Sequence, residues 1–212
     1  MNQPVPEIKH QYRTLAFICV GFIALSCILQ ITQGPEWASL NITKAKDGEY
    51  WRLITGHLVH LNWHHYLMNM TGLTLCLAVF RDDLAPRHWI PSFLFISLFS
   101  SIGLLTIHLD YYSYVGFSDV LHGWILLGVA ALVHKEPKMA LTVFVLFWMK
   151  IIEENMDLAF FTSYGVTGHI AKESHIFGAI GGLTYGALFL PSFQRWLKKP
   201  YLQVPKGEQP AA

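Results

Sequence analysis

The chain has 212 residues, of which 53% are hydrophobic and only 14% are charged, and its formal net charge is +1. A water-soluble domain carries about a quarter charged residues, so most of this surface faces something other than water. A net charge this close to zero argues against a nucleic-acid partner.

The N-terminal part of the chain predicts a first membrane span. Residues 1–13 are mostly polar and are followed by an uncharged run, Thr14–Pro35. A membrane-spanning helix needs about 20 apolar residues, so Thr14–Pro35 is long enough to be one. It lacks a small-residue cleavage site, and we expect a retained anchor rather than a signal peptide. The next segment, Glu36–Arg52, is long and mixed, with Trp37 and Trp51 of the type that lies at headgroup depth.

Five further apolar segments are predicted to span the membrane. The fifth span overall is the weakest, because it includes Lys150, which could snorkel to the interface. We therefore predict an all-α, polytopic membrane protein with a six-helix membrane domain at residues 14–193 and a basic, disordered tail at residues 194–212. The five additional spans are Asn62–Phe80, His88–Leu109, Gly116–His134, Met139–Ile152 and His175–Phe193.

The charges between the spans predict their orientation. Six spans place both termini on one side, and that side holds ten Lys and Arg residues against five on the other, as the positive-inside rule requires of the cytoplasmic side. The ten are Lys9, Arg13, Arg81, Arg87, Lys135, Lys138, Arg195, Lys198, Lys199 and Lys206. The five are Lys44, Lys46, Arg52, Lys150 and Lys172.

Polar side chains gather at one predicted depth. Spans two, four and six run in the same direction, so their first turns lie together near the outer face. Polar groups within spans are costly and usually functional, so this level is expected to hold the functional site. The polar residues in these turns are His64, His65, Asn69, Ser118, Asp119, His122 and His175.

Two of these residues suit nucleophilic catalysis. A serine hydroxyl becomes a nucleophile when a neighbouring base takes its proton, and histidine does this near neutral pH. Ser118 follows Gly116, at which the backbone can turn sharply. His175 precedes Gly178 and Gly182 on one helix face, where glycines allow a neighbouring helix to approach closely. The sequence therefore predicts Ser118 as the nucleophile and His175 as its base.

Two more residues suit an oxyanion hole. Acyl transfer needs hydrogen-bond donors for the developing oxyanion, each contributing about 3 kcal/mol. His65 and Asn69 are four residues apart, so both project from one face of the second span. With the Ser118 backbone amide they would provide three donors.

Together these motifs resemble the rhomboid proteases. The resemblance runs from Trp51 to Leu190, with Trp51-Arg52 and His60 as supporting features. It implies a serine endopeptidase that cuts a transmembrane protein substrate near the outer face, with a Ser–His dyad, no acid, no cofactor and no metal. It also implies that the fifth loop caps the site, a role that the apolar region Leu158–Tyr164 would suit. The motifs are Gly116-Phe117-Ser118, His65-x-x-x-Asn69 and His175-x-x-Gly178-x-x-x-Gly182.

The short six-span body and the run Tyr114–Gly123 look like the rhombosortase subgroup of this family. Its members are thought to process bacterial surface or secreted proteins that carry a C-terminal tail with Gly-Gly, a transmembrane segment and a basic cluster. This subgroup implies a bacterial inner-membrane location, with the active site near the periplasmic face.

Two residues depart from the family pattern. Asp119 stands where the family has glycine, and we expect it to be a helix-start residue, which the helix dipole favours. A carboxylate that faced inward would instead crowd the substrate or repel the oxyanion. His122 stands where many relatives have an aromatic residue stacked on the catalytic histidine, and an imidazole could stack as well.

Other interpretations stay open. His57, His60 and His64 could form a metal cluster, but no Cys or carboxylate stands at ligand spacing, and we expect His60 to bond the backbone of the first loop. A membrane haem or metal protein would use His pairs on facing spans. An inactive rhomboid-like binding protein would hold transmembrane clients without cutting them; Asp119 favours this alternative, whereas the presence of both Ser118 and His175 opposes it. The three cysteines, Cys19, Cys27 and Cys76, lie within apolar runs and indicate no disulfide framework.

Overall fold

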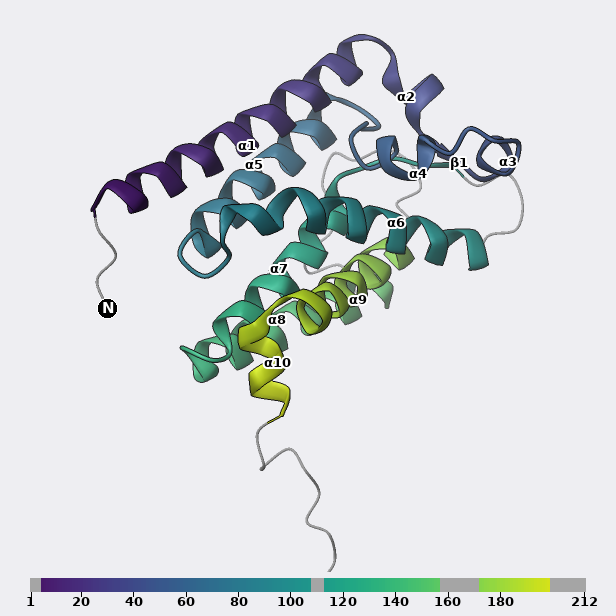
Figure 1. Ribbon diagram of the computed structural model, residues 1–212. Coiled ribbons are helices and arrows are strands. Elements are labelled where there is room, and N and C mark those ends of the chain that lie inside the picture. The colour runs from purple at the N-terminus through teal and green to yellow at the C-terminus, as the bar shows by residue number, and fades with distance from the viewer. Residues whose placement is uncertain (1–4, 108–112, 157–171, 199–212) are drawn as a thin grey trace, which may run out of the picture.

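The computed structural model describes residues 5–107, 113–156 and 172–198, which form a bundle of helices (Figure 1). The predicted all-α class is confirmed, apart from a pair of two-residue strands. The long helices are α1 (Val5–Ile31), α5 (Trp63–Phe80), α6 (Trp89–Ile107), α7 (Ser118–Leu132), α8 (Pro137–Asn155) and α9 (Lys172–Phe189). The short elements are α2 (Gly34–Ala38), β1 (Leu40–Asn41), α3 (Ile42–Lys46), α4 (Arg52–Thr55), the 3-10 helix η1 (Pro86–His88), β2 (Ser113–Tyr114) and α10 (Pro191–Leu197).

Local signals decide where several helices begin and end. α5 begins at the residue after Asn62, whose side chain caps it by accepting a hydrogen bond from the His65 amide. α1 ends at Ile31, before the end of the predicted span, because Gln33 takes a left-handed conformation with φ of 56° and Pro35 opens α2. α1 also begins earlier than predicted, at Val5.

The helix of the last predicted span, His175–Phe193, bends before the predicted end. α9 stops at Phe189, and α10 follows at an angle of 90°, because Pro191 cannot continue the helical hydrogen bonds. α10 reaches Leu197, so the first residues of the predicted disordered tail are helical. Residues from 199 onward lie outside the described part of the chain, as does the predicted cap Leu158–Tyr164.

Some of the helices have the length and the surface of membrane spans. By length and composition, Lys9–Ile31 and Pro86–Ile107 could each cross a membrane, and α9 with α10 would make a third if the bent pair is one span. Large apolar side chains cover the outside of α1; Phe17 and Ile31, for example, are 73% and 65% exposed. Such a surface suits contact with lipid.

The segment between α1 and α5 is folded at one end of the bundle (Figure 1). Its strand β1 pairs antiparallel with β2, with Leu40 opposite Tyr114. The buried Arg52 holds this segment together, since its guanidinium donates to the Ser39 carbonyl at 2.8 Å and to the Glu49 carboxylate at 2.6 Å. The strand pair therefore ties this segment to the chain just before α7.

Small residues bring α9 close to α7, as the sequence predicts. A Cβ atom at Gly178 would overlap the carbonyl oxygen of Asp119, and one at Gly182 would overlap that of Gly123. Within a membrane, close packing and interhelical hydrogen bonds hold helices together, so these glycines set the distance between the two helices.

An aromatic core fixes the start of α7. Phe117 is fully buried and stacks on Phe93, with ring centroids 5.7 Å apart. Phe22 and Trp124 contact the same ring edge-on. The residue before Ser118 is thus held from several sides, which leaves the backbone at Ser118 little freedom.

Candidate active site

Ser118 and His175 meet where the first turns of α7 and α9 lie together. Ser118 is the first residue of α7, and His175 lies in the first turn of α9. The Ser118 Oγ atom is 2.9 Å from His175 Nε2, and His175 is 5% exposed. At this distance a hydroxyl can transfer its proton to an imidazole. The two helix starts predicted to meet therefore do so.

Gly116 shapes the turn that presents Ser118. Its φ is +135°, a conformation that favours glycine, and a Cβ atom there would lie 2.8 Å from His65 Cε1. The Gly116 amide donates to the Gly56 carbonyl at 3.1 Å, and the Tyr114 hydroxyl donates to the Gly116 carbonyl at 2.8 Å. The peptide groups on either side of Gly116 are therefore both held by hydrogen bonds.

Two side chains of α5, His65 and Asn69, carry hydrogen-bond donors, and the His65 ring lies close to the turn that presents the nucleophile. The Leu61 amide donates to His65 Nδ1 at 3.4 Å, so the ring proton of His65 is on Nε2. A Cβ atom at Gly116 would lie 3.2 Å from that Nε2 and 3.7 Å from Ser118 Oγ, so both atoms border the same small space. Asn69 is buried, and its Nδ2 has no hydrogen-bond partner among the described residues. Both groups can therefore donate to a ligand.

His122 stacks on His175, as we considered possible for an imidazole at this position. Their ring centroids are 4.1 Å apart and their planes differ by 11°. His122 Nδ1 lies 2.6 Å from the Ser118 carbonyl oxygen, which can only accept, so Nδ1 carries the proton. Nε2 then accepts from the Lys150 ammonium at 3.3 Å. These two bonds hold the ring flat against His175.

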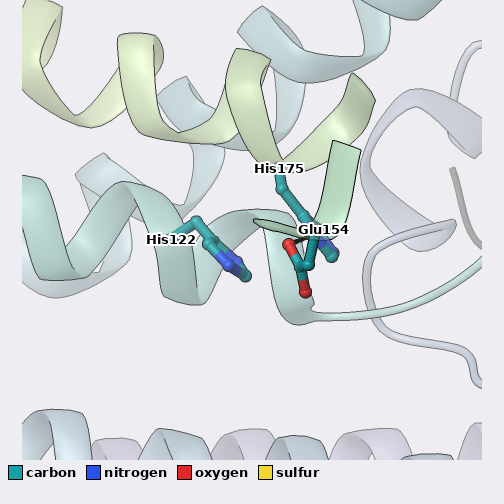
Figure 2. Close-up of side chains that lie close together, drawn as sticks. All are labelled: His122, Glu154 and His175. Carbon is teal, nitrogen blue, oxygen red and sulfur yellow. Dashed lines mark hydrogen bonds and ion pairs between the residues drawn. The ribbon is translucent and has the colours of Figure 1, made fainter. Parts of the chain in front are cut away.

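An acid that was not predicted from the sequence lies at the Nδ1 edge of the His175 ring. Glu154 Oε2 is 3.1 Å from His175 Nδ1, and Glu154 Oε1 is bonded to the Lys150 ammonium. In Figure 2 the side chains of His122, Glu154 and His175 converge from α7, α8 and α9. The resemblance implied a dyad without an acid, and the arrangement differs from that expectation. The signal in the sequence was a Lys and a Glu four residues apart near the end of a mostly apolar helix.

Asp119 is directed into a buried contact and not toward a ligand. Its carboxylate is fully buried and accepts a hydrogen bond from the Val120 amide at 2.8 Å. His57 Nδ1 lies 3.0 Å from Asp119 Oδ1, and His57 Nε2 lies 2.9 Å from Ser101 Oγ. Asp119 is thus a helix-start residue, as expected, and the alternative of an inward-facing carboxylate is wrong.

His60 does not bond the loop backbone as expected. It is fully buried, and neither ring nitrogen has a hydrogen-bond partner in the described part of the chain. Its ring contacts those of His65 and Tyr66 edge-on, with centroids 5.2 Å and 5.5 Å away. Burial, with a smaller effect from nearby His65, lowers the pKa of His60 to about 3. His60 is therefore a neutral packing residue near neutral pH.

The three histidines considered as an alternative metal cluster, His57, His60 and His64, are not the described residues that could hold a metal ion. Within the described residues the group that could hold a metal ion is instead His122, Glu154 and His175, whose ligand atoms lie within 4.8 Å of one another. The Lys150 ammonium already contacts two of these three side chains. A cation of the chain itself therefore neutralises the carboxylate of this group.

One comparison identifies relatives of this chain. Residues 47–192 match the Rhomboid domain family. This segment covers well over half of the 212 residues and includes all the site residues described above. No curated protein matches the chain.

Proposed function

We infer the function of this chain from its family: it belongs to the rhomboid family, whose members are intramembrane serine proteases. It is accordingly an integral membrane protein. Our proposal is that it is an active endopeptidase, with Ser118 as nucleophile and His175 as base. The observation that carries the proposal is the 2.9 Å contact between Ser118 Oγ and His175 Nε2.

The geometry supports the following reaction. As Ser118 Oγ attacks the carbonyl carbon of the scissile bond, its proton passes to His175 Nε2. The carbonyl oxygen becomes an oxyanion, which His65 Nε2–H, Asn69 Nδ2–H and the Ser118 amide stabilise. His175 then gives the proton to the leaving amine as the C–N bond breaks, which leaves an acyl ester on Ser118. Water, deprotonated by His175, hydrolyses this ester and restores the free hydroxyl.

We further propose that α1, α5, α6, α7, α8 and α9 each cross the membrane, with both termini in the cytoplasm. The excess of Lys and Arg on that side supports this orientation. It places the first turns of α5, α7 and α9 near the outer face, which would be the periplasmic face of a bacterial inner membrane.

The proposed substrate is a membrane-anchored protein cut near the outer end of its transmembrane segment. The run Tyr114–Gly123 supports the narrower proposal of a rhombosortase acting on C-terminal Gly-Gly tails. The buried contact of Asp119 with His57 supports an active protease over an inactive binding protein, because it engages the carboxylate away from a ligand.

Labelling with a fluorophosphonate probe in detergent tests the proposed nucleophile. The parent protein should be labelled, whereas Ser118→Ala should not be labelled and His175→Ala should lose at least ~10³-fold in rate. Ser113→Ala is the matched control, because Ser113 is an exposed serine five residues earlier, and it should be labelled like the parent. A folded parent that resists the probe, or equal labelling of Ser118→Ala, would contradict the proposal.

Cleavage of a tailed substrate tests the narrower proposal. A reporter protein that ends in Gly-Gly, a transmembrane segment and a basic cluster should be cut by the parent and not by Ser118→Ala. The same reporter with Gly-Gly replaced by Ala-Ala should be cut more slowly. Equal cutting of both reporters would still support a rhomboid protease but would exclude a preference for Gly-Gly.

A further inference from the structure

We propose, on the basis of the function proposed above, that Glu154 is a positioning residue that orients His175 and stabilises its charged form. The site would then work as a Ser118–His175–Glu154 triad, with Lys150 holding the acid in place. The family resemblance implies a dyad without an acid, so it assigns no role to this carboxylate.

The contact of Glu154 selects the tautomer that the base needs. An ionised carboxylate can only accept hydrogen bonds, so the 3.1 Å contact places the ring proton of His175 on Nδ1. Nε2 then presents its lone pair to Ser118 Oγ at 2.9 Å. The opposite tautomer would carry a proton on Nε2 and could not take one from the serine.

The charge of Glu154 favours the protonated state of His175 that forms during the reaction. A hydrogen bond between two charged groups is about twice as strong as a neutral one, and the Glu154 side chain is only 14% exposed, so water screens it weakly. The carboxylate takes up no proton; it balances the positive charge that His175 gains from Ser118.

Lys150 keeps the carboxylate in position. Its ammonium is bonded to Glu154 Oε1, one turn away on α8, which leaves Oε2 for His175. The same ammonium contacts His122, the ring stacked on His175. The Lys150 ammonium thus holds both the Glu154 carboxylate and the His122 ring. Through these two charged residues α8 contributes to a site formed otherwise by α5, α7 and α9.

The groups around His175 determine how its protonation responds to a change at Glu154. Those that face it from other helices are Glu154 and Lys150 of α8, His122 of α7 and His65 of α5. Lys172 and Glu173 precede it on α9. Glu154 is the acid among them that contacts the imidazole, so loss of its charge makes protonation of His175 less favourable.

A purely structural role for Glu154 makes a different prediction. An ion pair that only fastened α8 to α9 would lower stability when removed but would not change the pH dependence of the reaction. The deciding experiment therefore measures the rate of fluorophosphonate labelling at Ser118 against pH, for the parent, Glu154→Gln and Glu154→Asp. Glu153→Gln is the matched control, since it removes the same charge one residue earlier on α8.

We expect Glu154→Gln to lower the plateau rate by about 100-fold. This is less than the ~10⁴-fold loss known for the same change at a fully buried triad acid, because Glu154 is partly exposed. The midpoint of the pH profile should move to lower pH. Glu154→Asp keeps the charge and should lie between Glu154→Gln and the parent, whereas Glu153→Gln should match the parent. A parental plateau and midpoint in Glu154→Gln would overturn the positioning role and leave Ser118 and His175 untouched.

Proton NMR provides a test that does not depend on activity. In Ser118→Ala, which cannot be labelled, the hydrogen-bonded Nδ1–H of His175 should give a low-field resonance that disappears when Glu154→Ala is added, because alanine, unlike glutamine, leaves no oxygen to accept that hydrogen bond. A resonance that is unchanged in Glu154→Ala would overturn the proposal. A parent that resists the probe would overturn the proposed protease function, and the resonance would then still decide whether Glu154 orients His175.

Discussion

Replacing Asp119 by glycine would restore the residue that the family has after its serine, yet we expect it to destabilise this protein. Asp119 and His57 are both fully buried, and His57 bridges Asp119 and Ser101. In Asp119→Gly the Nδ1–H of His57 and the amide of Val120 lose their acceptor. The main effect of the substitution should therefore be on the attachment of the first loop to α7 and not on the reaction at Ser118.

The size of the loss follows from these contacts. An orphaned buried donor costs about 1–3 kcal/mol, and His57 Nδ1 has no other partner among the described residues. Glycine within a helix costs roughly a further 0.5–1 kcal/mol. We therefore expect Asp119→Gly to lower the free energy of unfolding by about 3 kcal/mol. Asp119→Asn keeps an oxygen acceptor and should cost about 1 kcal/mol.

Unfolding in mixed detergent micelles, followed by circular dichroism, measures these differences. A double-mutant cycle with His57→Phe should give a coupling energy of about 1–3 kcal/mol, because the contact between the imidazole and the Asp119 carboxylate is already lost once the imidazole is gone. The labelling rate of the Asp119→Gly molecules that remain folded should equal or exceed that of the parent. Parental stability of Asp119→Gly, or a coupling energy near zero, would refute the assigned contact, and complete loss of labelling in folded protein would mean that Asp119 takes part in the reaction.

Two further predictions test the packing around the site. Gly182→Ala places a methyl group against the Gly123 carbonyl, so it should lower stability by about 1–3 kcal/mol and slow labelling of Ser118. Gly21→Ala, whose Cβ would have no neighbour within 4 Å, should lower neither stability nor the labelling rate. Parental labelling of Gly182→Ala would contradict the close contact of α7 and α9. Burial lowers the pKa of His60 to about 3, so between pH 6.5 and 3 the unfolded chain binds a proton at His60 and the folded protein does not. The free energy of unfolding should therefore fall by up to about 1.4 kcal/mol per pH unit as the pH drops through this range. His60→Phe should flatten this dependence in the same unfolding assay; an unchanged slope would show that other groups cause it.

The sequence by itself determined the helical class and much of the helix order, because these depend on local patterns. An apolar run long enough to cross a bilayer predicts a helix wherever it occurs, and a capping residue such as Asn62 marks the start of α5 to within one residue. Gly116 and the glycines after His175 indicated a tight turn and a close helix contact, since only glycine fits such positions. These signals were enough to predict that Ser118 and His175 would be neighbours.

Only the tertiary structure decided which polar side chains pair with one another. Glu154 is 21 residues before His175 on another helix, and Asp119 is 62 residues after His57, so no spacing in the sequence relates them. Whether a polar side chain faces a partner, the site or lipid depends on how each helix is rotated about its axis and where its neighbours lie. That rotation is set by the packing of the whole bundle, including two-residue strands and buried rings that leave no periodic pattern. The motifs therefore predicted the serine and the histidine, while the acid behind the histidine and the contact of Asp119 emerged from helix packing.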